Sequence, residues 1–359
     1  MSMGLLALAG RPALALGRGP FDAVVEQAAS SQSGRRFAGL QQAIDAAPTD
    51  GKLPYRIFLG PGTWQAAFLI DRPRVQLIGA GVQATRLIFA AGAGQIAPDG
   101  KPYGTFRTAA LKITAPDVHL SGLSIENSYD AVTEMHKPNG LKADLPGSQQ
   151  AIALTLDGDT DRAVIRDCHL ASHQDTLYCA RRRALFTSCS ILGSYDFIFG
   201  GAAARFEGCT IVSRPRVEPV EGCIAAPSTL LDQAAGLVFD GCDLTAQPGV
   251  PDGSVFLGRP WRASTMVGGK RIGDPRSVGM AAYLRCRIGR HIAPSGWTRM
   301  WYTGADGNPR TFFEPEDARF AEFHNIGPGA QGTRRGKQLS AQQADALSRA
   351  AMFGDWHPG

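Results

Sequence analysis

The feature of this sequence that most constrains its fold is a short apolar pattern that recurs around cysteines. The intervals from Cys168 to Cys189 and from Cys189 to Cys209 differ by a single position, after which the intervals to Cys242 and then to Cys286 lengthen. A repeat of about 20 residues, with short strands and no helix between them, is typical of a solenoid. The copies are Val164-Ile165 before Cys168 and Leu170, Leu185-Phe186 before Cys189 and Ile191, Phe206 before Cys209 and Ile211, Val238-Phe239 before Cys242 and Leu244, and Tyr283-Leu284 before Cys286 and Ile288.

Apolar segments without cysteine extend this series toward the N-terminus. Two parallel strands need a crossover of a dozen or more residues, and one coil of a β-helix supplies it without a helix. The repeat therefore predicts an all-β chain folded as a right-handed parallel β-helix, a solenoid in which each copy forms one short strand. The earlier segments are Val75-Gln76-Leu77-Ile78, Leu87-Ile88-Phe89 and Val118 through Ile125.

The cysteines themselves are predicted to be packing residues. Seven is an odd number, so at least one thiol is unpaired in a monomer. The sequence contains no CxxC pair, which argues against a zinc site. We expect the cysteines to face inward as a ladder of small apolar side chains, and not to act as disulfides or nucleophiles.

Helices are expected at the two ends of the chain. A short N-terminal helix stops before Pro48 and caps the first coil, and a C-terminal helix begins at a capping box of Ser340 and Gln343 and packs on the side of the solenoid. Between them, residues 130–149 are polar and irregular and predict a loop beside a groove. The residues that define the two helical faces are Phe37, Leu40, Gln41 and Ile44, and Ala344, Leu347 and Ala351.

Composition and charge narrow the classes of protein further. The 359 residues carry a formal charge of +5 without the runs of Lys and Arg that a nucleic-acid groove requires. No apolar stretch approaches the roughly 20 residues of a membrane span. Residues 1–20 are expected to be an N-terminal extension. Their apolar residues are compatible with the remnant of an export signal, but Arg11 interrupts the apolar run, so both interpretations stay open. Residues 21–359 are expected to form a single domain.

Two aspartates follow neighbouring copies of the repeat. The interval from Asp175 to Asp196 is the same as that from Cys168 to Cys189, so the aspartates are predicted to occupy equivalent positions on adjacent coils. Stacked strands lie about 4.7–4.9 Å apart. Two carboxylates this close tend to share one proton, which supplies an acid and a nucleophile from one residue type. The sequence has no GxSxG, HExxH or GxxxxGK[ST] motif that would indicate another chemistry.

The surroundings of Asp196 suggest that it needs a partner. It lies in the aromatic segment Tyr195-Asp196-Phe197-Ile198-Phe199, where a charged carboxylate is partly desolvated. Arg259 is the candidate cation. Spacing alone leaves other interpretations open, because an aspartate pair in a solenoid is often a turn or ladder residue and an isolated Arg-Pro-Trp is often a surface or core element.

Four segments, in order, closely resemble the signature segments of the pectin methylesterase (pectinesterase) family, and most of all its bacterial members. The resemblance runs from about residue 21 to the C-terminus, because later landmarks match as well. The four segments are Gln150-Ala151-Ile152-Ala153-Leu154, Gln174-Asp175-Thr176-Leu177-Tyr178, Asp196-Phe197-Ile198-Phe199-Gly200 and Leu257-Gly258-Arg259-Pro260-Trp261.

The resemblance implies a role for each catalytic residue. Asp196 would attack the C6 methyl ester of a galacturonate unit and form an acyl-enzyme, and Asp175 would act first as acid and then as base. Gln150 and Gln174 would donate hydrogen bonds to the oxyanion. Arg259 would orient Asp196 and keep it ionised.

The resemblance also implies a substrate and its binding residues. Tyr178, Phe199 and Trp261 would contact the sugar chain of methyl-esterified homogalacturonan (pectin), although core packing remains an alternative for all three. No metal and no cofactor are expected. The expected protein is a monomer, secreted or periplasmic, with no nucleic acid as partner.

The sequence differs from the usual family pattern at two positions, and three competing functions stay open. The usual Gly-x-Tyr-x-Glu segment appears as Gly62-Thr63-Trp64-Gln65-Ala66, without the Glu, and Ala110 replaces a groove threonine. These changes put the substrate subsites in doubt.

The competing functions are a polysaccharide lyase or glycoside hydrolase on the same fold, an esterase or thioesterase acting on another substrate, and a noncatalytic carbohydrate-binding solenoid.

Overall fold

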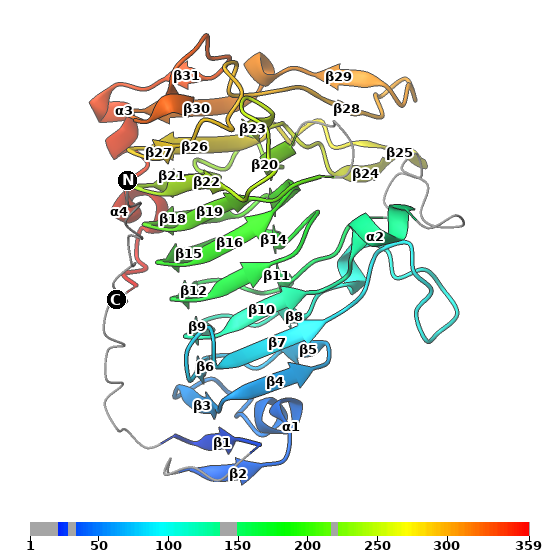
Figure 1. The fold of residues 1–359 in the computed structure, drawn as a ribbon, viewed down its shortest axis with the longest axis vertical. Helices are drawn as coiled ribbons and strands as arrows, with labels where there is room; N and C mark the ends of the chain where they lie inside the picture. The colour runs from blue at the N-terminus through cyan, green and yellow to red at the C-terminus, as the bar shows by residue number, and fades with distance from the viewer. Residues whose placement is uncertain (1–20, 28–33, 137–148, 217–221, 359) are drawn as a thin grey trace, which may run out of the picture.

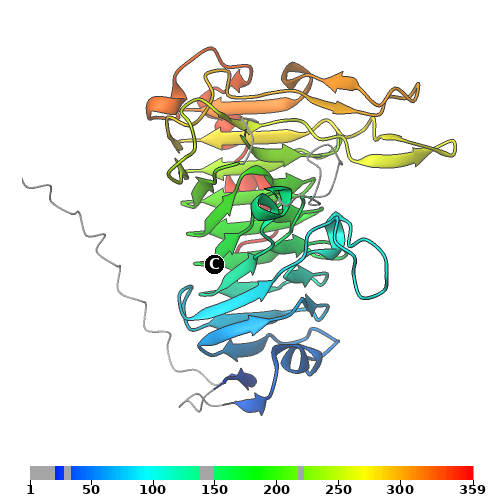
Figure 2. The same ribbon diagram turned by 45° about the vertical axis from the view of Figure 1, so that its right-hand side comes forward.

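The chain forms an elongated stack of coils. The computed structural model describes residues 21–27, 34–136, 149–216 and 222–358. Within these residues, three parallel sheets run along the stack, and each coil visits sheet A, then sheet B, then sheet C (Figures 1 and 2). The prediction of a right-handed parallel β-helix is confirmed.

Sheet A runs the full length of the stack. Its strands, in spatial order, are β2 (Arg35–Phe37), β1 (Ala23–Val25), β3 (Tyr55–Leu59), β6 (Val75–Gly79), β9 (His119–Ser121), β12 (Ala163–Arg166), β15 (Arg183–Thr187), β18 (Ala203–Glu207), β21 (Leu237–Asp240), β26 (Met280–Leu284), β30 (Arg319–Phe323) and β31 (Lys337–Gln338).

Sheets B and C follow sheet A in each coil. Sheet B contains β4 (Gly62–Gln65), β7 (Thr85–Phe89), β10 (Ser124–Asn127), β13 (His169–Ala171), β16 (Ser190–Gly193), β19 (Thr210–Ser213), β22 (Asp243–Ala246) and β27 (Arg287–Ile288). Sheet C contains β5 (Phe68–Ile70), β8 (Leu111–Ile113), β11 (Leu154–Leu156), β14 (Leu177–Cys179), β17 (Tyr195–Gly200), β20 (Gly222–Pro227) and β23 (Val255–Gly258).

The coil length in the middle of the stack matches the interval between the first two cysteines. Val164 pairs with Leu185 in sheet A and Leu177 pairs with Ile198 in sheet C. Both pairs are separated along the chain by the same interval as Cys168 and Cys189, so the coil length holds on two sides of the solenoid. The interval predicted from the cysteines is therefore the true repeat at this point of the chain.

The five cysteines of the repeat lie at corners, whereas Cys179 and Cys223 lie in strands β14 and β20, and the expectation of one strand per copy is wrong. Each copy forms two strands, one in sheet A and one in sheet B, with the cysteine between them. The residue before each of these five corner cysteines has a left-handed backbone, for example Asp167 with φ 50° and Ser188 with φ 52°, and this conformation turns the chain from one sheet into the next. Gly208, Gly241 and Arg285 have the same conformation before Cys209, Cys242 and Cys286.

The interior of the stack contains two ladders. All seven cysteines are buried and unpaired, as predicted. Four of the thiols lie 3.4–3.6 Å from a carbonyl oxygen of the preceding coil. An aromatic ladder lies beneath sheet A, where Phe186, Phe206, Phe239 and Tyr283 stack with ring centroids 4.7, 4.6 and 4.4 Å apart. These stacked rings contribute roughly 0.5–1.5 kcal/mol per pair beyond their burial.

The N-terminal helix caps the stack as expected. Helix α1 (Leu40–Asp45) buries Leu40, Ala43 and Ile44. The amide of Gln41 bonds to both backbone groups of Leu69 in strand β5, at 3.0 Å each, and this fixes the helix over the first coil. Phe37, assigned to this helix from the sequence, lies in strand β2 instead.

Two other expectations about helices are wrong. Helix α2 (Ala131–His136) lies in the middle of the chain, within the segment expected to be an irregular loop, and residues 137–148 of that segment lie outside the described residues. The C-terminal helix is divided into α3 (Ala341–Asp345), which has the predicted capping box, and α4 (Arg349–Phe353). The division occurs because the hydroxyl of Ser348 caps a new helix by accepting a hydrogen bond from the Ala351 amide.

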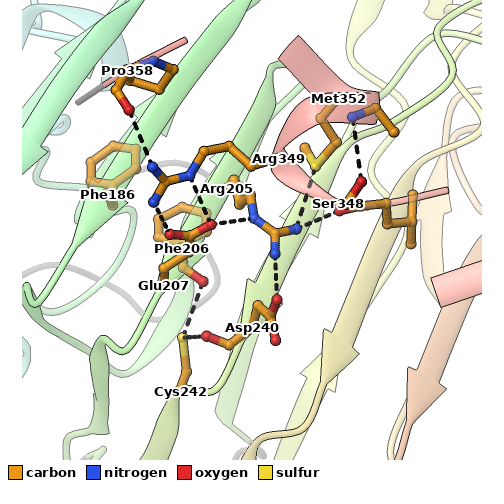
Figure 3. A network of polar contacts seen from close by, with 12 residues as sticks. Phe186, Arg205, Phe206, Glu207, Asp240, Cys242, Ser348, Arg349, Met352 and Pro358 are labelled. Atoms are coloured by element: carbon orange, nitrogen blue, oxygen red, sulfur yellow. Dashed lines mark hydrogen bonds and ion pairs between the residues drawn. The ribbon is translucent and has the colours of Figure 1, made fainter. Parts of the chain in front are cut away.

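A buried ion network holds α3 and α4 against sheet A. Arg205 in β18 is 4% exposed and bonds to Glu207 at 2.6 Å, to Asp240 and to the carbonyl of Leu347 (Figure 3). Arg349 of α4 bonds to Glu207 as well. The C-terminal segment is therefore attached to the side of the solenoid, as predicted.

Long excursions leave the stack on both sides of sheet C. Residues 90–110 and 128–153 connect sheet B to sheet C, and the first of these contains the 3-10 helix η1 (Thr105–Arg107). On the other side, two antiparallel hairpins occur between sheet C and sheet A (Figure 1). The hairpins are β24 (Ser264–Val267) with β25 (Lys270–Gly273), and β28 (Met300–Tyr302) with β29 (Thr311–Phe313); the 3-10 helices η2 (Pro315–Asp317) and η3 (Pro328–Ala330) follow them. No helix in the described part is long and apolar enough to cross a membrane.

Candidate active site

Gln150, Gln174 and the two aspartates lie at or just before the start of three successive strands of sheet C. Isolated parallel bridges pair Gln150 with Gln174 and Gln174 with Tyr195. Asp175 and Asp196 each follow one of these bridged residues. The repeat thus places the two aspartates at equivalent positions on adjacent coils.

Both aspartates are buried and have the same unusual backbone. Asp175 is 7% exposed with φ 65°, and Asp196 is 6% exposed with φ 47°. The amide of Asp175 donates to the carbonyl of Tyr195 at 3.2 Å, which joins the two coils at the site. Aspartate tolerates the left-handed region better than most residues, yet such positions still cost free energy and are concentrated at functional sites.

Arg259 donates two hydrogen bonds to the carboxylate of Asp196. Its Nε lies 2.8 Å from Oδ1 and its Nη2 lies 2.5 Å from Oδ2 of Asp196. The arginine follows strand β23, and its amide donates to the carbonyl of Ala225 at 2.9 Å. Burial alone would lower the pKa of Arg259, but the carboxylate of Asp196 outweighs burial and raises it. A bidentate pair of this kind fixes the orientation of the carboxylate as well as its charge.

Asp175 is in the opposite situation. Burial, and then the charge of Asp196, raise the pKa of Asp175 well above its ordinary value, while Arg259 and a hydrogen bond from Gln174 oppose the shift less strongly. Asp175 therefore retains its proton in conditions where an exposed aspartate is ionised. The pair consists of one protonated acid and one carboxylate with a fixed cation.

Gln150 and Gln174 lie beside this pair. The side-chain oxygen of Gln150 is buried and has no hydrogen-bond partner among the described residues. A buried unpaired polar atom is rare in native structures, and a functional role is one of its explanations. The segment that follows Gln150 is fixed by Asn127, whose side chain donates to the carbonyls of Ala91, Thr108 and Ile152 at 2.7–3.2 Å.

The three predicted groove aromatics form one cluster. Tyr178 and Phe199 stack with centroids 4.7 Å apart, and Trp261 meets Phe199 edge-on at 5.7 Å. Phe106, from the segment between sheets B and C, extends the row to the other side of Tyr178 at 4.9 Å. Phe199 is 4% exposed, whereas Tyr178 and Trp261 are half-buried. Phe199 thus supports the two rings that remain accessible.

Sequence reasoning missed Arg214 and Arg216, which line a cavity beside the site. An open cavity of about 470 Å³ lies where sheet B turns into sheet C, and His173, Arg214 and Arg216 contribute to its lining. Burial, and then Arg214, lower the pKa of His173 to about 4, so this histidine is neutral at ordinary pH. Tyr195 contacts both Arg216 and Arg259. The signal available in the sequence was the pair of arginines in Ser213-Arg214-Pro215-Arg216, one coil after Tyr195.

The two departures from the family pattern are at Ala66 and Ala110. Ala66, which stands where the family has the Glu, follows strand β4 of sheet B and packs partly buried against the main core, and Ala110 is fully buried in that core. In the described part of the chain, no group of three or more His, Cys, Asp or Glu side chains is arranged to hold a metal ion.

Comparison with known proteins places this site in a family. The family model described as Pectinesterase matches residues 22–355. The chain belongs to the pectinesterase family. It is a carboxylic ester hydrolase that acts on pectin.

Similar proteins support this assignment along nearly the whole chain. Pectinesterase A of Dickeya dadantii (strain 3937) is 34% identical over 344 residues, which cover 94% of this chain and 92% of that protein. The pectin methylesterase from Erwinia chrysanthemi superimposes with a TM-score of 0.87 at 33% identity, covering 95% of this chain and 99% of the other. The pectin methylesterase from Yersinia enterocolitica has a TM-score of 0.82 at 34% identity, with 89% and 99% coverage.

Proposed function

We propose that this pectinesterase hydrolyses the C6 methyl esters of galacturonate units through a covalent intermediate on Asp196. The observation that carries the proposal is the contrast between two adjacent carboxyl groups. Arg259 holds Asp196 with two hydrogen bonds, and burial raises the pKa of Asp175. A fixed carboxylate beside a protonated acid is the arrangement that ester cleavage by an acyl-enzyme requires.

The first step forms the acyl-enzyme. An oxygen of the Asp196 carboxylate attacks the ester carbonyl carbon and forms a tetrahedral intermediate. When the intermediate collapses, the bond to the methoxy oxygen breaks and Asp175 transfers its proton to that oxygen, so that methanol leaves. The products of this step are an anhydride between the sugar carboxyl and Asp196, and an ionised Asp175.

Gln150 and Gln174 are proposed to stabilise the oxyanion of the intermediate. Their positions on successive coils, beside the two aspartates, support this role. Removing one donor from such a site costs about 2.7–4 kcal/mol of transition-state stabilisation. The hydrogen bond from Asn127 to Ile152 and the bridge between coils fix the backbone near these residues, which supports donors that are oriented before substrate binds.

The second step releases the sugar acid. Ionised Asp175 takes a proton from water, and the resulting hydroxide adds to the anhydride and displaces the Asp196 carboxylate. Asp175 is protonated again and Asp196 is free. Each turnover converts one ester and one water into methanol and a carboxylic acid, so the solution becomes more acidic.

Tyr178 and Trp261 are proposed to contact the sugar chain. Both rings are half-buried and lie on the outer surface of sheet C, supported by Phe199 beneath them. Accessible aromatic faces suit the apolar faces of pyranose rings. The excursions on both sides of sheet C would confine the polymer to this row. Methyl-esterified homogalacturonan is therefore the proposed ligand of the whole groove.

The competing enzyme classes receive less support. An inverting glycosidase keeps its carboxyl groups about 6.5–9.5 Å apart, whereas these two follow directly paired positions on adjacent coils. The family match favours neither a lyase nor a thioesterase. We further propose that residues 21–359 form one domain, that the protein is a monomer, and that nucleic acid is not a partner. We also propose that it acts outside the cytoplasm, because polymeric pectin does not cross a membrane.

The direct test is a product analysis on highly methylated pectin. We expect one methanol per new carboxyl group, with no new reducing ends and no unsaturated ends, and the same rate in the presence of a chelator. Chain cleavage without methanol would contradict the proposal and indicate a glycosidase or a lyase. Methanol release from small esters but not from pectin would contradict the assignment of the polymer as substrate.

A further inference from the structure

The ring of Tyr195 contacts two guanidinium groups. The guanidinium carbon of Arg259 lies 4.3 Å from the ring centroid, and that of Arg216 lies 4.2 Å from it. Arg259 is the residue that grips Asp196, and Arg216 lines the neighbouring cavity. Tyr195 therefore connects the catalytic carboxylate, through Arg259, to a second cation.

The backbone explains how adjacent residues reach the same arginine. Successive side chains of a regular strand point to opposite faces, so Tyr195 and Asp196 would normally diverge. Asp196 has φ 47°, and the pairing of β17 with β20 shifts its register between Tyr195 and Ile198. This irregularity lets the ring of Tyr195 and the carboxylate of Asp196 contact one guanidinium from two directions.

The π face of Tyr195, and not its hydroxyl group, makes the contact. Burial raises the pKa of Tyr195 to about 12, so the phenol is neutral at ordinary pH. Its hydroxyl makes no hydrogen bond among the residues that the structure describes. Attraction to the two cations then comes from the negative face of the ring.

We propose that Tyr195 is a positioning residue that holds Arg259 in the orientation required for its bidentate contact with Asp196. The proposal rests on the proposed role of Asp196 as nucleophile. Two hydrogen bonds to Asp196 leave the plane of the guanidinium free to tilt, and an aromatic face packed against that plane restricts the tilt. The nucleophile is thereby held in an attacking geometry, which affects the chemical step more than the binding of substrate.

The test compares Tyr195→Phe with Tyr195→Leu. Phenylalanine keeps the ring face, so we expect kcat within about twofold of the wild type. Leucine keeps apolar bulk but removes the π face, so we expect kcat to fall roughly 10- to 30-fold while KM changes less than about threefold. Phe37→Leu is the matched control, because Arg35 lies 4.8 Å from the Phe37 ring at the far end of the stack, and we expect unchanged activity.

Three results would overturn the proposal. Full activity of Tyr195→Leu would show that the ring is dispensable, and equal losses in both variants would assign the role to the hydroxyl group. A loss confined to KM would mean that the ring contacts substrate. Methanol release by the wild type is measured in the same assay, so a failure of the proposed function appears in that control.

A crystal structure of Tyr195→Leu provides a readout that does not depend on activity. We expect Arg259 to lose one or both of its contacts with Asp196, which are 2.8 and 2.5 Å in the wild type. An unchanged bidentate contact in a correctly folded variant would contradict the proposal, whatever the kinetics.

Discussion

At the scale of single residues, the site depends on the different surroundings of two neighbouring aspartates. Asp196 has a dedicated cation in Arg259, whereas the environment of Asp175 is dominated by burial and by the charge of its neighbour. These surroundings assign the proton to Asp175. They also make Asp175 lower the stability of the folded protein at a pH where an exposed aspartate is ionised, because the buried carboxyl group cannot gain the hydration that an ionised group has in the unfolded chain.

Asp175→Asn tests both consequences. The native-state pKa of Asp175 lies above the ordinary value of 3.8, so between these two pKa values the native protein binds more protons than the unfolded chain and loses stability as pH rises. We expect the variant to melt at a higher temperature than the wild type at pH 7, and at nearly the same temperature below pH 3.8. Its kcat on pectin should fall at least about 100-fold.

Thermal unfolding at the two pH values and methanol release measure these effects. An equal melting temperature at pH 7 would mean that Asp175 is not held protonated. In the wild type, the protonated form of Asp175 is needed for the first step, so activity should decline as pH rises through its raised pKa.

The sequence predicted some of these residues for a physical reason and others only by resemblance. The interval of one coil made Asp175 and Asp196 neighbours, and the strand register at that point repeats over the same interval. Arg259 lies 63 residues from Asp196, and no local pattern indicates which coil it reaches. The contact of Tyr195 with Arg259 depends on a left-handed residue and a register shift, neither of which leaves a periodic signal.

At the scale of elements, the corners and the C-terminal helices show where sequence patterns were misleading. The apolar run around each of the five repeat cysteines resembles one strand, yet a left-handed residue before the cysteine divides it into two. Likewise, the apolar spacing of Ala344, Leu347 and Ala351 suggests one helix, but Ser348 begins a second. In both cases one residue with a local hydrogen bond or backbone preference overrides the apolar period.

Among the contacts between elements, we expect those of Arg205 to have the largest effect on the free energy of unfolding. Its side chain is 5% exposed, and it joins β18 to Asp240, Glu207 and the carbonyl of Leu347. We expect Arg205→Met to lower the free energy of unfolding by about 3–5 kcal/mol, because it removes a buried cation that Glu207, Asp240 and the Leu347 carbonyl all contact. Denaturant unfolding measures the change, and limited proteolysis should show early cleavage of residues 340–358.

Arg285→Met is the matched control. Arg285 bonds to the same Asp240, at 2.5 Å, but its side chain is 47% exposed. An exposed pair contributes about 0–1 kcal/mol, so we expect little change in stability. Equal effects of the two substitutions would show that burial of Arg205 is not what makes its network important.

At the scale of the whole molecule, the solenoid explains both the rigidity of the site and the state of its thiols. The coils that begin with β15, β18 and β21 each contribute one rung to the cysteine ladder, one rung to the aromatic ladder and one strand to sheet C, so the interior that stabilises the stack also aligns the candidate site residues. The long-range order of the fold was predictable because it repeats. The excursions beside sheet C do not repeat, and their structures were not predicted.

The cysteine ladder gives a test of this interior. All seven thiols are buried and unpaired, and burial raises the pKa of Cys168 to about 12. We expect no reaction of the native protein with a thiol-specific disulfide reagent over minutes, and reaction of seven thiols after unfolding without reductant. Fewer than seven reactive thiols in the unfolded chain would reveal a disulfide and contradict the free ladder.

The most direct test of the whole account is methanol release from pectin by Asp196→Asn. This substitution keeps the shape of the side chain and removes the nucleophile, so we expect a loss of at least about 1,000-fold in kcat with an unchanged circular dichroism spectrum. Asp159→Asn, at an exposed turn residue, is the control and should retain wild-type activity. Methanol release by a folded Asp196→Asn protein at a rate near that of the wild type would contradict the account.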